Sequence, residues 1–234
     1  MIKTKIVISL DTNFFLAKKV VDICIKNGFN LFKVGHLLFD TEQKILDYIT
    51  KKGGKVILDL KFFDIPSVIS KAVEEILKIH KIFAFTVHTL GGKQMLKEVV
   101  QTVKKTSKET KIFGVTVLTS LDSSDIKELG FKTNSVETQV KLLAKFAKKN
   151  GLDGIVCSPR EVKIIKNIYG KNFLTLVPGV SIEKTNSLDQ KRTLLLKDMI
   201  EYGADYVVIG RAVYESKDID CALKKIRFFI SKTD

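Results

Sequence analysis

The sequence predicts an α/β protein made of a single (β/α)8 barrel, a TIM barrel, that spans residues 1–234. Short apolar runs alternate with amphipathic stretches eight times along the chain, which is the pattern of a repeated strand–helix unit. Most of the short runs are apolar throughout, as expected for parallel strands that are covered on both faces. The length suits one barrel, although the same alternation also fits an open doubly wound sheet.

Eight short segments rich in Val, Ile and Phe are the predicted strands, because β-branched and aromatic residues favour extended backbone. In chain order they are Lys5–Leu10, Leu31–Val34, Lys55–Leu60, Phe83–His88, Ile112–Leu118, Gly154–Cys157, Phe173–Val177 and Tyr206–Ile209.

Eight amphipathic segments are the predicted helices. In one of them, apolar residues recur at positions 136, 140, 143, 144 and 147, the spacing that buries one face of a helix. Glycines stand where several helices should end, and prolines stand near two helix starts. The predicted helices are Phe14–Asn27, Thr41–Lys52, Val68–Ile79, Lys93–Lys105, Val136–Asn150, Pro159–Ile168, Lys191–Tyr202 and Ile219–Ser231.

No linker or change in composition divides the chain. Its longest irregular stretch runs from Gly179 to Gln190 and lacks a strong apolar period. Long loops in compact domains tend to be functional. We therefore expect this stretch to be a mobile lid over the site.

The chain is strongly basic, with 40 Lys and Arg against 26 Asp and Glu and a net charge of +14. Such a charge makes nucleic acid a partner to consider. Only four of the basic residues are arginines, however, and the lysines are spread over successive predicted helices instead of one groove. We therefore expect no nucleic-acid partner. A small anionic substrate would be attracted by the same positive field.

The location expected from the sequence is the cytoplasm, with no membrane partner. No apolar run is long enough to span a bilayer, and the N-terminal residues do not have the pattern of a signal peptide. Cys24, Cys157 and Cys221 are odd in number and widely scattered, which fits buried thiols in a reducing compartment.

Polar side chains follow the apolar strands at the point where each strand ends. In a (β/α)8 barrel the carboxyl ends of the strands carry the active site. The residues at or near these ends are Asp11, Lys33, Asp59, Lys61, His88, Thr119 and Arg211. We expect them to line one site.

The segment from Asp59 to Pro66 carries the sharpest signal. Residues two apart on a strand point to the same side, so Asp59 and Lys61 should share a face, and Asp64 should lie in the following turn. With Lys33 and Asp11 from the two preceding strands, these residues would form alternating positive and negative groups that keep one another ionised. The pattern predicts a catalytic charge cluster, although an ion pair with a purely structural role would give the same sequence pattern.

A second segment indicates phosphate binding. Pro178 and Gly179 follow the seventh predicted strand, and Gly210 and Arg211 follow the eighth. Loops at these two places in such barrels frequently bind phosphate. The glycines would let backbone amides approach an anion, and the arginine would supply a bidentate donor.

No cofactor or metal site is expected. The three histidines, His36, His80 and His88, are not spaced as a metal-binding set. The chain also contains no Gly-rich nucleotide loop followed by Lys-Ser or Lys-Thr.

Taken in order, these segments resemble the orotidine 5′-phosphate decarboxylase family, and the resemblance covers nearly the whole chain. The matching segments are Ser9-Leu10-Asp11, Phe32-Lys33-Val34-Gly35, Asp59-Leu60-Lys61-Phe62-Phe63-Asp64-Ile65-Pro66, Val87-His88, Val117-Leu118-Thr119-Ser120, Val177-Pro178-Gly179-Val180, Asp189-Gln190-Lys191-Arg192 and Val208-Ile209-Gly210-Arg211.

The resemblance implies a decarboxylase that converts orotidine 5′-phosphate to UMP without metal or cofactor. Lys61 would donate a proton to the ring carbon that loses carbon dioxide, and Asp59 would face the substrate carboxylate. Lys33 would hold the charge network and contact the ribose. Asp64 would enter the site of a partner subunit, which makes the expected enzyme a homodimer with composite sites.

Further residues are implied to bind the substrate. Asp11 would bind a ribose hydroxyl, and Thr119 or Ser120 would bind the pyrimidine edge. Gln190, Gly210 and Arg211 would hold the phosphate. The full implied set is Asp11, Lys33, Ile65, Thr119, Ser120, Pro178, Ser181, Gln190, Gly210 and Arg211.

Three positions depart from the family pattern. Phe63 replaces a common histidine, Val68 replaces a usual threonine, and Ser181 replaces an arginine that is typical beside the phosphate. The change at Ser181 matters most, because a neutral hydroxyl takes the place of a charge-assisted contact. Lys184 is the residue we expect to compensate for it.

Two other functions remain open from the sequence. A related barrel, the magnesium-dependent keto-gulonate phosphate decarboxylase, shares the D-x-K-x-x-D strand and differs in requiring a metal. A non-catalytic basic protein that binds nucleic acid would bind DNA or RNA in a salt-dependent way.

Overall fold

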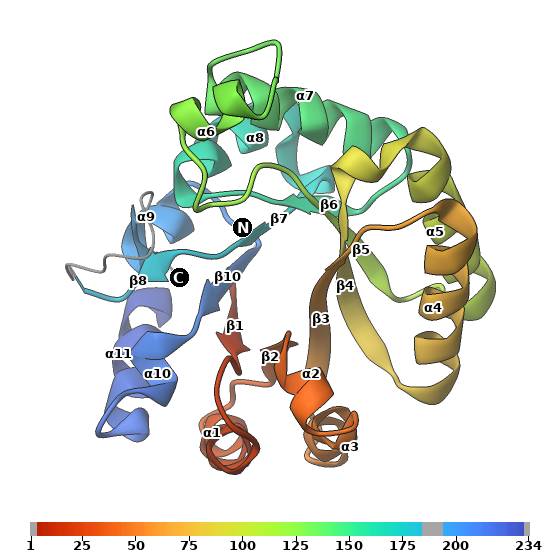
Figure 1. The fold of residues 1–234 in the computed structure, drawn as a ribbon. Coiled ribbons are helices and arrows are strands. Elements are labelled where there is room, and N and C mark those ends of the chain that lie inside the picture. The colour runs from red at the N-terminus through yellow and green to blue at the C-terminus, as the bar shows by residue number, and fades with distance from the viewer. Residues whose placement is uncertain (1–3, 184–193, 232–234) are drawn as a thin grey trace.

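The computed structural model describes residues 4–183 and 194–231 of the protein. Eight parallel strands form a closed barrel in the order β1-β10-β7-β6-β5-β4-β3-β2 (Figure 1). The barrel closes because β1 pairs with β2 on one side and with β10 on the other. The predicted (β/α)8 barrel is therefore confirmed, and the open doubly wound sheet is ruled out.

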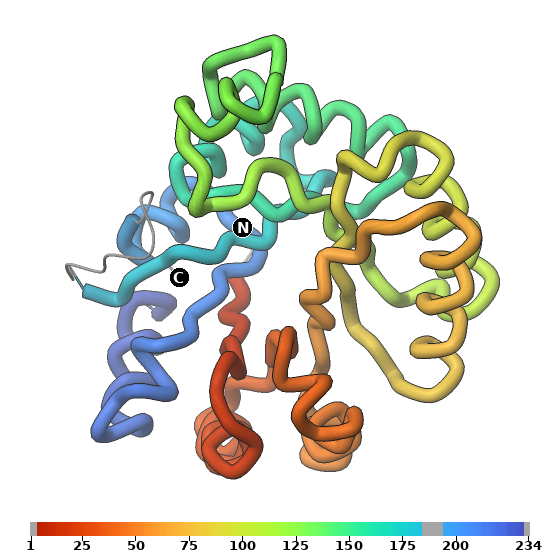
Figure 2. Tube along the Cα trace, in the orientation of Figure 1, coloured from red at the N-terminus to blue at the C-terminus, as the bar shows by residue number. Residues whose placement is uncertain are grey.

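The chain makes one circuit around the barrel, which brings its last barrel strand back beside its first (Figure 2). The barrel strands are β1 (Lys5–Ser9), β2 (Leu31–Val34), β3 (Lys55–Phe62), β4 (Ile82–His88), β5 (Lys111–Val115), β6 (Gly154–Val156), β7 (Leu174–Val177) and β10 (Tyr206–Ile209). The helices are α1 (Phe14–Lys26), α2 (Leu37–Asp40), α3 (Lys44–Lys51), α4 (Pro66–Ile79), α5 (Gly92–Thr106), α6 (Ser123–Glu128), α7 (Val136–Lys149), α8 (Val162–Tyr169), α9 (Leu196–Glu201), α10 (Arg211–Tyr214) and α11 (Ile219–Ser231).

Three predicted helices differ from the structure at their starts. The one predicted over Pro159–Ile168 begins with a 3-10 helix, Pro159–Glu161, and becomes an α-helix only at Val162. The helix predicted over Thr41–Lys52 begins only at Lys44, because Gln43 has a φ of 67° and a left-handed residue interrupts the helical hydrogen bonds. The helix predicted over Lys191–Tyr202 was wrong at Leu194–Leu195. Those residues form the short strand β9, which pairs in parallel with β8 (Val180–Ser181).

Three short helices were not predicted. Besides α2 and α10, the chain forms α6 after the fifth barrel strand, which ends at Val115 and not at Leu118 as predicted. The start of α6 is fixed by a capping box, in which Asp122 accepts hydrogen bonds from the backbone of Ser124 and Asp125 while Asp125 accepts from the backbone of Asp122. The Asp-Ser-Ser-Asp sequence is the signal that could have found it.

The inside of the barrel and the space beneath the helices hold separate hydrophobic clusters. The inner cluster contains Val7, Leu31, Ile57, Ala84, Phe113, Leu176, Tyr206 and Val208. Side chains two residues apart on a strand point the same way, so each inward row continues toward the carboxyl end of its strand. On the first four strands the next residues of these rows are Ser9, Lys33, Asp59 and Thr86. The barrel interior thus changes from apolar to polar at its carboxyl end.

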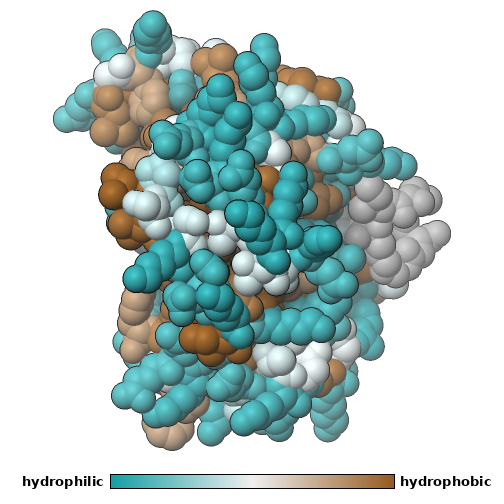
Figure 3. All heavy atoms as spheres, turned by 90° about the vertical axis from the view of Figure 1, so that its right-hand side faces the viewer, coloured by the Kyte–Doolittle hydropathy of each residue, from teal (hydrophilic) through white to brown (hydrophobic). Residues whose placement is uncertain are grey.

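The outer surface is mainly hydrophilic on the side that carries α4 and α5, where hydrophobic groups form separate, smaller patches (Figure 3). In the part of the chain that the structure describes, no helix has both the length and the apolar character needed to cross a membrane.

The opposite, amino-terminal mouth of the barrel is held by a buried acidic residue. Asp205 accepts hydrogen bonds from the backbone amide and the hydroxyl of Thr175, and it forms an ion pair with Lys166. Only 4% of the Asp205 side chain and 11% of the Lys166 side chain are exposed. A carboxylate that is buried to this degree depends on its partners, because its hydration has been lost.

We expect Asp205→Ala to lower the free energy of unfolding by about 3–5 kcal/mol, because it leaves the Lys166 ammonium buried without its counter-charge. Denaturant unfolding followed by circular dichroism measures the change. Glu74→Ala is the matched control, since Glu74 pairs with Lys78 on the exposed face of α4 and such pairs contribute about 0.3–0.5 kcal/mol. Equal effects of the two substitutions would contradict the assignment.

Candidate active site

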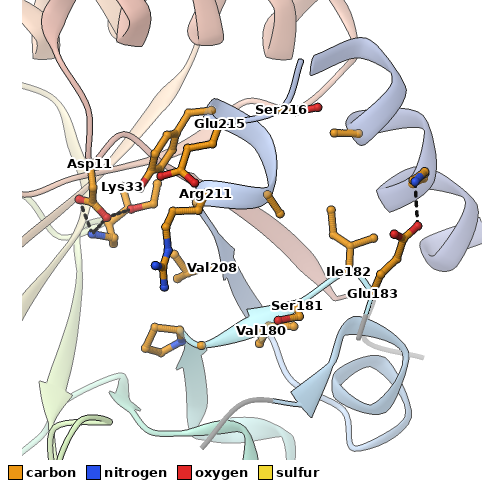
Figure 4. A pocket seen from close by; sticks show the side chains of 18 of the residues that line it. Asp11, Lys33, Val180, Ser181, Ile182, Glu183, Val208, Arg211, Glu215 and Ser216 are labelled. Atoms are coloured by element: carbon orange, nitrogen blue, oxygen red, sulfur yellow. Dashed lines mark hydrogen bonds and ion pairs between the residues drawn. The ribbon is translucent and has the colours of Figure 1, made fainter. Parts of the chain in front are cut away.

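A cavity of about 890 Å³ opens at the carboxyl ends of the barrel strands. The ends of β1, β2, β3, β7 and β10 line it, together with α10 and the start of α11 (Figure 4). Four of the predicted charged residues, Asp11, Lys33, Asp59 and Lys61, line its inner part. The cavity is therefore at the place where the sequence predicted the site.

The four charged groups form one continuous chain of ion pairs. The Lys33 ammonium lies 3.1 Å from Asp11 Oδ1 and 3.3 Å from Asp59 Oδ2. The Lys61 ammonium lies 3.0 Å from the same Asp59 oxygen. At the other end, the Ser9 hydroxyl donates to Asp11 Oδ2 at 2.5 Å. Positive and negative groups thus alternate from β1 to β3, in the order that the sequence predicted.

Asp59 is the central charge of this cluster, with 12% of its side chain exposed. Burial alone would raise the pKa of its carboxyl, since a low-dielectric surrounding disfavours the anion. The ammonium groups of Lys33 and Lys61 and hydrogen bonds from Lys61 and Thr86 outweigh that effect, so the pKa lies below its usual value. Asp59 therefore stays ionised at neutral pH.

The backbone around Lys61 is not a regular strand. Leu58 pairs with Phe85 and Phe62 pairs with Val87, so three residues of β3 face the single residue Thr86 of β4. Lys61 has a φ of 48°, a left-handed conformation that is uncommon for a residue with a side chain. The prediction that Asp59 and Lys61 share a face by simple strand alternation was therefore incomplete. The bulge brings the two side chains together.

Thr86 is a site residue that the sequence reasoning missed. Its side chain is fully buried, and its hydroxyl accepts a hydrogen bond from the backbone amide of Lys61 and donates one to Asp59 Oδ1. The signal that could have found it is its position two residues after Ala84, in the inward row of β4.

His88, at the end of β4, is half-buried beside the cluster. Burial is the larger cause that lowers the pKa of its imidazole, and the nearby Lys61 ammonium lowers it further. Both effects disfavour the imidazolium. The ring packs against Phe63, with the two ring centroids 5.4 Å apart.

Asp64 and Ile65 do not join the main cavity. Asp64 lies in a small, mainly apolar depression with Phe39, Phe63 and Val68, and its Oδ1 accepts a hydrogen bond from the Ile65 amide at 2.7 Å. Ile65 and the three apolar residues have 47–74% of their surface exposed. Two of the departures from the family pattern, at positions 63 and 68, therefore lie on this exposed surface.

The other end of the cavity carries the predicted phosphate-binding residues. Pro178, Ser181, Gly210 and Arg211 all line it. Arg211 extends from the start of α10 into the space between Asp11 and Lys33 on one side and Val180 and Ser181 on the other (Figure 4). A Cβ on Gly210 would stand 3.2 Å from the Cβ of Ser9, so a larger residue at the end of β10 would press against the neighbouring strand β1.

The remaining predicted residues divide into three groups. Thr119 lines the cavity, whereas Ser120 does not. Gln190 and Lys184 lie outside the described residues. Among the residues that the structure describes, no group of three or more His, Cys, Asp or Glu side chains is placed to hold a metal ion.

The two ends of the cavity suit different parts of one ligand. The Arg211 end can bind an anionic group through charge-assisted hydrogen bonds. The Asp59–Lys61 end presents a carboxylate and an ammonium side by side, which can repel a second carboxylate and donate a proton. The cavity thus combines a group that can bind an anion with a carboxylate–ammonium pair that can act on another part of the same ligand.

Comparison with known proteins gives consistent matches over most of the chain. Residues 4–226 match the family model described as Orotidine 5′-phosphate decarboxylase / HUMPS family. The orotidine 5′-phosphate decarboxylase of Carboxydothermus hydrogenoformans is 36% identical over 228 residues, which cover 94% of this chain and 93% of the relative. That of Wolbachia pipientis subsp. Culex pipiens is 42% identical over 170 residues, 73% of each chain. The crystal structure of the orotidine 5′-phosphate decarboxylase from Lactobacillus acidophilus matches with a TM-score of 0.83 and 28% identity, and the match covers 97% of this chain and 99% of that one.

We expect Lys61→Met to raise the pKa of His88, because it removes the positive charge that disfavours the imidazolium. The pKa should stay below the ordinary value of a histidine, since the effect of burial remains. NMR titration resolves the change, as the chain has three histidines. Lys149→Met, at the exposed end of α7, should leave the His88 pKa unchanged; the same shift in both variants would count against a local effect of Lys61.

Proposed function

The chain belongs to the orotidine 5′-phosphate decarboxylase / HUMPS family and, as a carboxy-lyase, decarboxylates orotidine 5′-phosphate to UMP in pyrimidine biosynthesis; we propose that Lys61 protonates the carbanion formed in this reaction. The observation that carries the proposal is the contact between the Lys61 ammonium and Asp59 at 3.0 Å, in a cavity that also holds Arg211.

In the proposed reaction the bond between the pyrimidine ring and its carboxylate breaks, and the electron pair stays on the ring carbon. Carbon dioxide leaves, and Lys61 donates a proton to the same carbon, which completes UMP. The resulting neutral amine then regains a proton from water. Atoms and electrons balance without a redox step, so the chemistry requires no oxidant or reductant.

The field of the cluster has to supply most of the catalysis. Two carboxylates about 4 Å apart repel by about 4 kcal/mol at an effective dielectric constant near 20, so Asp59 contributes that order of energy against the substrate carboxylate. Enzymes lower their barriers by about 8–23 kcal/mol. Repulsion is therefore too small by itself. Stabilisation of the developing carbanion by the fixed ammonium of Lys61 is the larger contribution in our proposal.

We assign the phosphate of the substrate to the Arg211 end of the cavity, with Gly210, Pro178 and Ser181 beside it. A guanidinium binds a phosphate through two parallel hydrogen bonds. Asp11 and Thr119, which also line the cavity, are assigned to the ribose and the pyrimidine edge. Gln190 and Ser120 retain their expected roles as proposals from family resemblance.

We further propose that the protein acts as a homodimer in which Asp64 completes the partner's site. Asp64 does not line the cavity of its own chain, and it is surrounded by the exposed side chains of Phe39, Phe63, Ile65 and Val68. Large apolar side chains gathered on a surface mark an interaction site. A second copy would cover them and would bring Asp64 toward the neighbouring cluster.

A cytoplasmic location is also part of the proposal. The substrate is a phosphate ester, and a permanently charged molecule of this kind does not cross an apolar bilayer unaided. The enzyme and its substrate should therefore share one compartment. Cys24 and Cys157 are buried thiols, as expected for a protein of a reducing compartment.

We expect Lys61→Ala to reduce kcat by at least about 10²–10⁴-fold, the usual contribution of a positioned proton donor. The loss of orotidine 5′-phosphate absorbance with purified protein measures it, and circular dichroism checks the fold. Lys149→Ala is the control, because it removes a similar charge from the opposite side of the barrel. Ordinary turnover in the Lys61 variant would overturn the assignment.

The same assay in excess EDTA separates the proposed reaction from that of a magnesium-dependent relative. Full activity of the wild-type protein with EDTA is expected. If the protein does not convert orotidine 5′-phosphate but decarboxylates a sugar phosphate in a magnesium-dependent way, its activity is that of the magnesium-dependent relative.

Mixed dimers test the composite site. Asp59→Ala and Asp64→Ala should each be nearly inactive alone, but random exchange of their subunits should restore about a quarter of the wild-type sites, because half of the dimers are hybrids with one intact site. Mixing Asp59→Ala with Lys61→Ala is the control and should restore nothing, since both substitutions affect the same side of each site. No recovery in the first mixture, despite demonstrated exchange, would refute the contribution of Asp64.

A further inference from the structure

We propose that Thr86 is a positioning residue for the decarboxylation, and that its hydroxyl fixes the Asp59 carboxylate and the Lys61 backbone relative to each other. The proposal rests on the proposed function of the Asp59–Lys61 cluster. Thr86 belongs to β4, whereas both charged residues belong to β3. The hydroxyl that holds the two charged residues therefore belongs to a neighbouring strand, outside the segment that carries the charges.

The Lys61 backbone needs such a contact because the pairing of β3 with β4 is irregular. Between the pairs Leu58–Phe85 and Phe62–Val87, the two strands lose their regular register. A bulge leaves extra residues unpaired, so the ladder does not hold them. Lys61, with its φ of 48°, lies within this interval. Its backbone is therefore held by contacts other than regular strand pairing.

The Thr86 hydroxyl supplies two of those contacts with one oxygen atom. It accepts a hydrogen bond from the Lys61 amide at 2.9 Å and donates one to Asp59 Oδ1 at 2.9 Å. A hydroxyl has one proton to donate and two lone pairs that accept, so both bonds form at the same time. The side chain is fully buried, and water does not compete for either bond.

This arrangement decides which carboxylate oxygen faces the ammonium groups. Oδ1 of Asp59 is bound to Thr86, so Oδ2 is turned toward Lys33 at 3.3 Å and Lys61 at 3.0 Å. The terminal torsion of an aspartate is broad, so without a partner the carboxylate can rotate. Loss of the hydroxyl would free both Asp59 and the backbone that carries Lys61. The proton donor would then be less well aligned with the reacting carbon.

A positioning role should appear in kcat more than in KM, because Thr86 lies beside the reacting end of the cavity and not beside Arg211. Thr86→Val removes the hydroxyl and keeps the shape of the side chain. We expect it to lower kcat by about 10–100-fold, in line with the cost of small misplacements of catalytic groups, and to change KM by less than about threefold. Thr86→Ser keeps the hydroxyl and should retain kcat within about threefold of wild type.

Thr110→Val is the matched control. Thr110 is also a buried threonine, and its hydroxyl donates to the carbonyl of Ile82 at the opposite mouth of the barrel. The Thr110→Val variant loses a comparable hydrogen bond and should keep the wild-type kcat. If Thr86→Val does not fold, as judged by circular dichroism, Thr86→Ala serves the same comparison with Thr86→Ser.

A second readout is independent of turnover. Carbon-13 NMR titration should show a higher pKa for Asp59 in Thr86→Val than in wild type, because one hydrogen bond that favours the anion has been removed. Thr110→Val should leave that pKa unchanged.

The possible outcomes separate the two proposals. Wild-type kcat in Thr86→Val, or an equal loss in Thr86→Ser, would overturn the positioning role, since the hydroxyl would then be dispensable or the methyl group would be what matters. A wild-type protein that does not convert orotidine 5′-phosphate would instead overturn the proposed function. In that case the Asp59 pKa in Thr86→Val still decides whether Thr86 holds the carboxylate. A pKa equal to that of the wild type would refute this contact.

Discussion

The site depends on one buried carboxylate, that of Asp59. An ion removed from water has to regain its lost hydration from nearby groups, and a negative charge in a barrel interior needs positive charges and hydrogen-bond donors around it. Lys33, Lys61 and Thr86 supply these at 2.9–3.3 Å. The two lysines are in turn held by ion pairs with Asp11 and Asp59. A cluster of this kind is preorganised, because its members hold one another in place before a substrate arrives.

The barrel explains why these groups meet. Its strands are parallel, so their carboxyl ends converge, and their inward rows change from the apolar residues around Ile57 to polar residues one position further along. The apolar layer below excludes water from the floor of the cavity. This raises the strength of the charge interactions above it, since the effective dielectric constant falls. The opposite mouth contains a similar buried ion pair, between Asp205 and Lys166.

The departures from the family pattern fall on two different surfaces. Phe63 and Val68 lie on the exposed apolar surface around Asp64, where a change from polar to apolar side chains increases the area that a second copy of the chain would bury. Ser181 lines the cavity together with Arg211, the residue to which we assign the substrate phosphate. The charge cluster itself carries no departure. The structure brings its four residues together in one chain of ion pairs.

The sequence by itself determined the strand–helix order and the identity of the four clustered charges, and it favoured a closed barrel over a doubly wound sheet. These follow from local patterns, namely apolar runs, helical periodicity and the residues that end each strand. The tertiary structure decided the bulge in β3, the left-handed backbone at Lys61, the hydrogen bonds of Thr86 and the outward position of Asp64. The physical reason is that strand register is set between segments far apart in the chain. Thr86 is 25 residues from Lys61, and no local pattern around either residue specifies that the two will share a hydrogen bond.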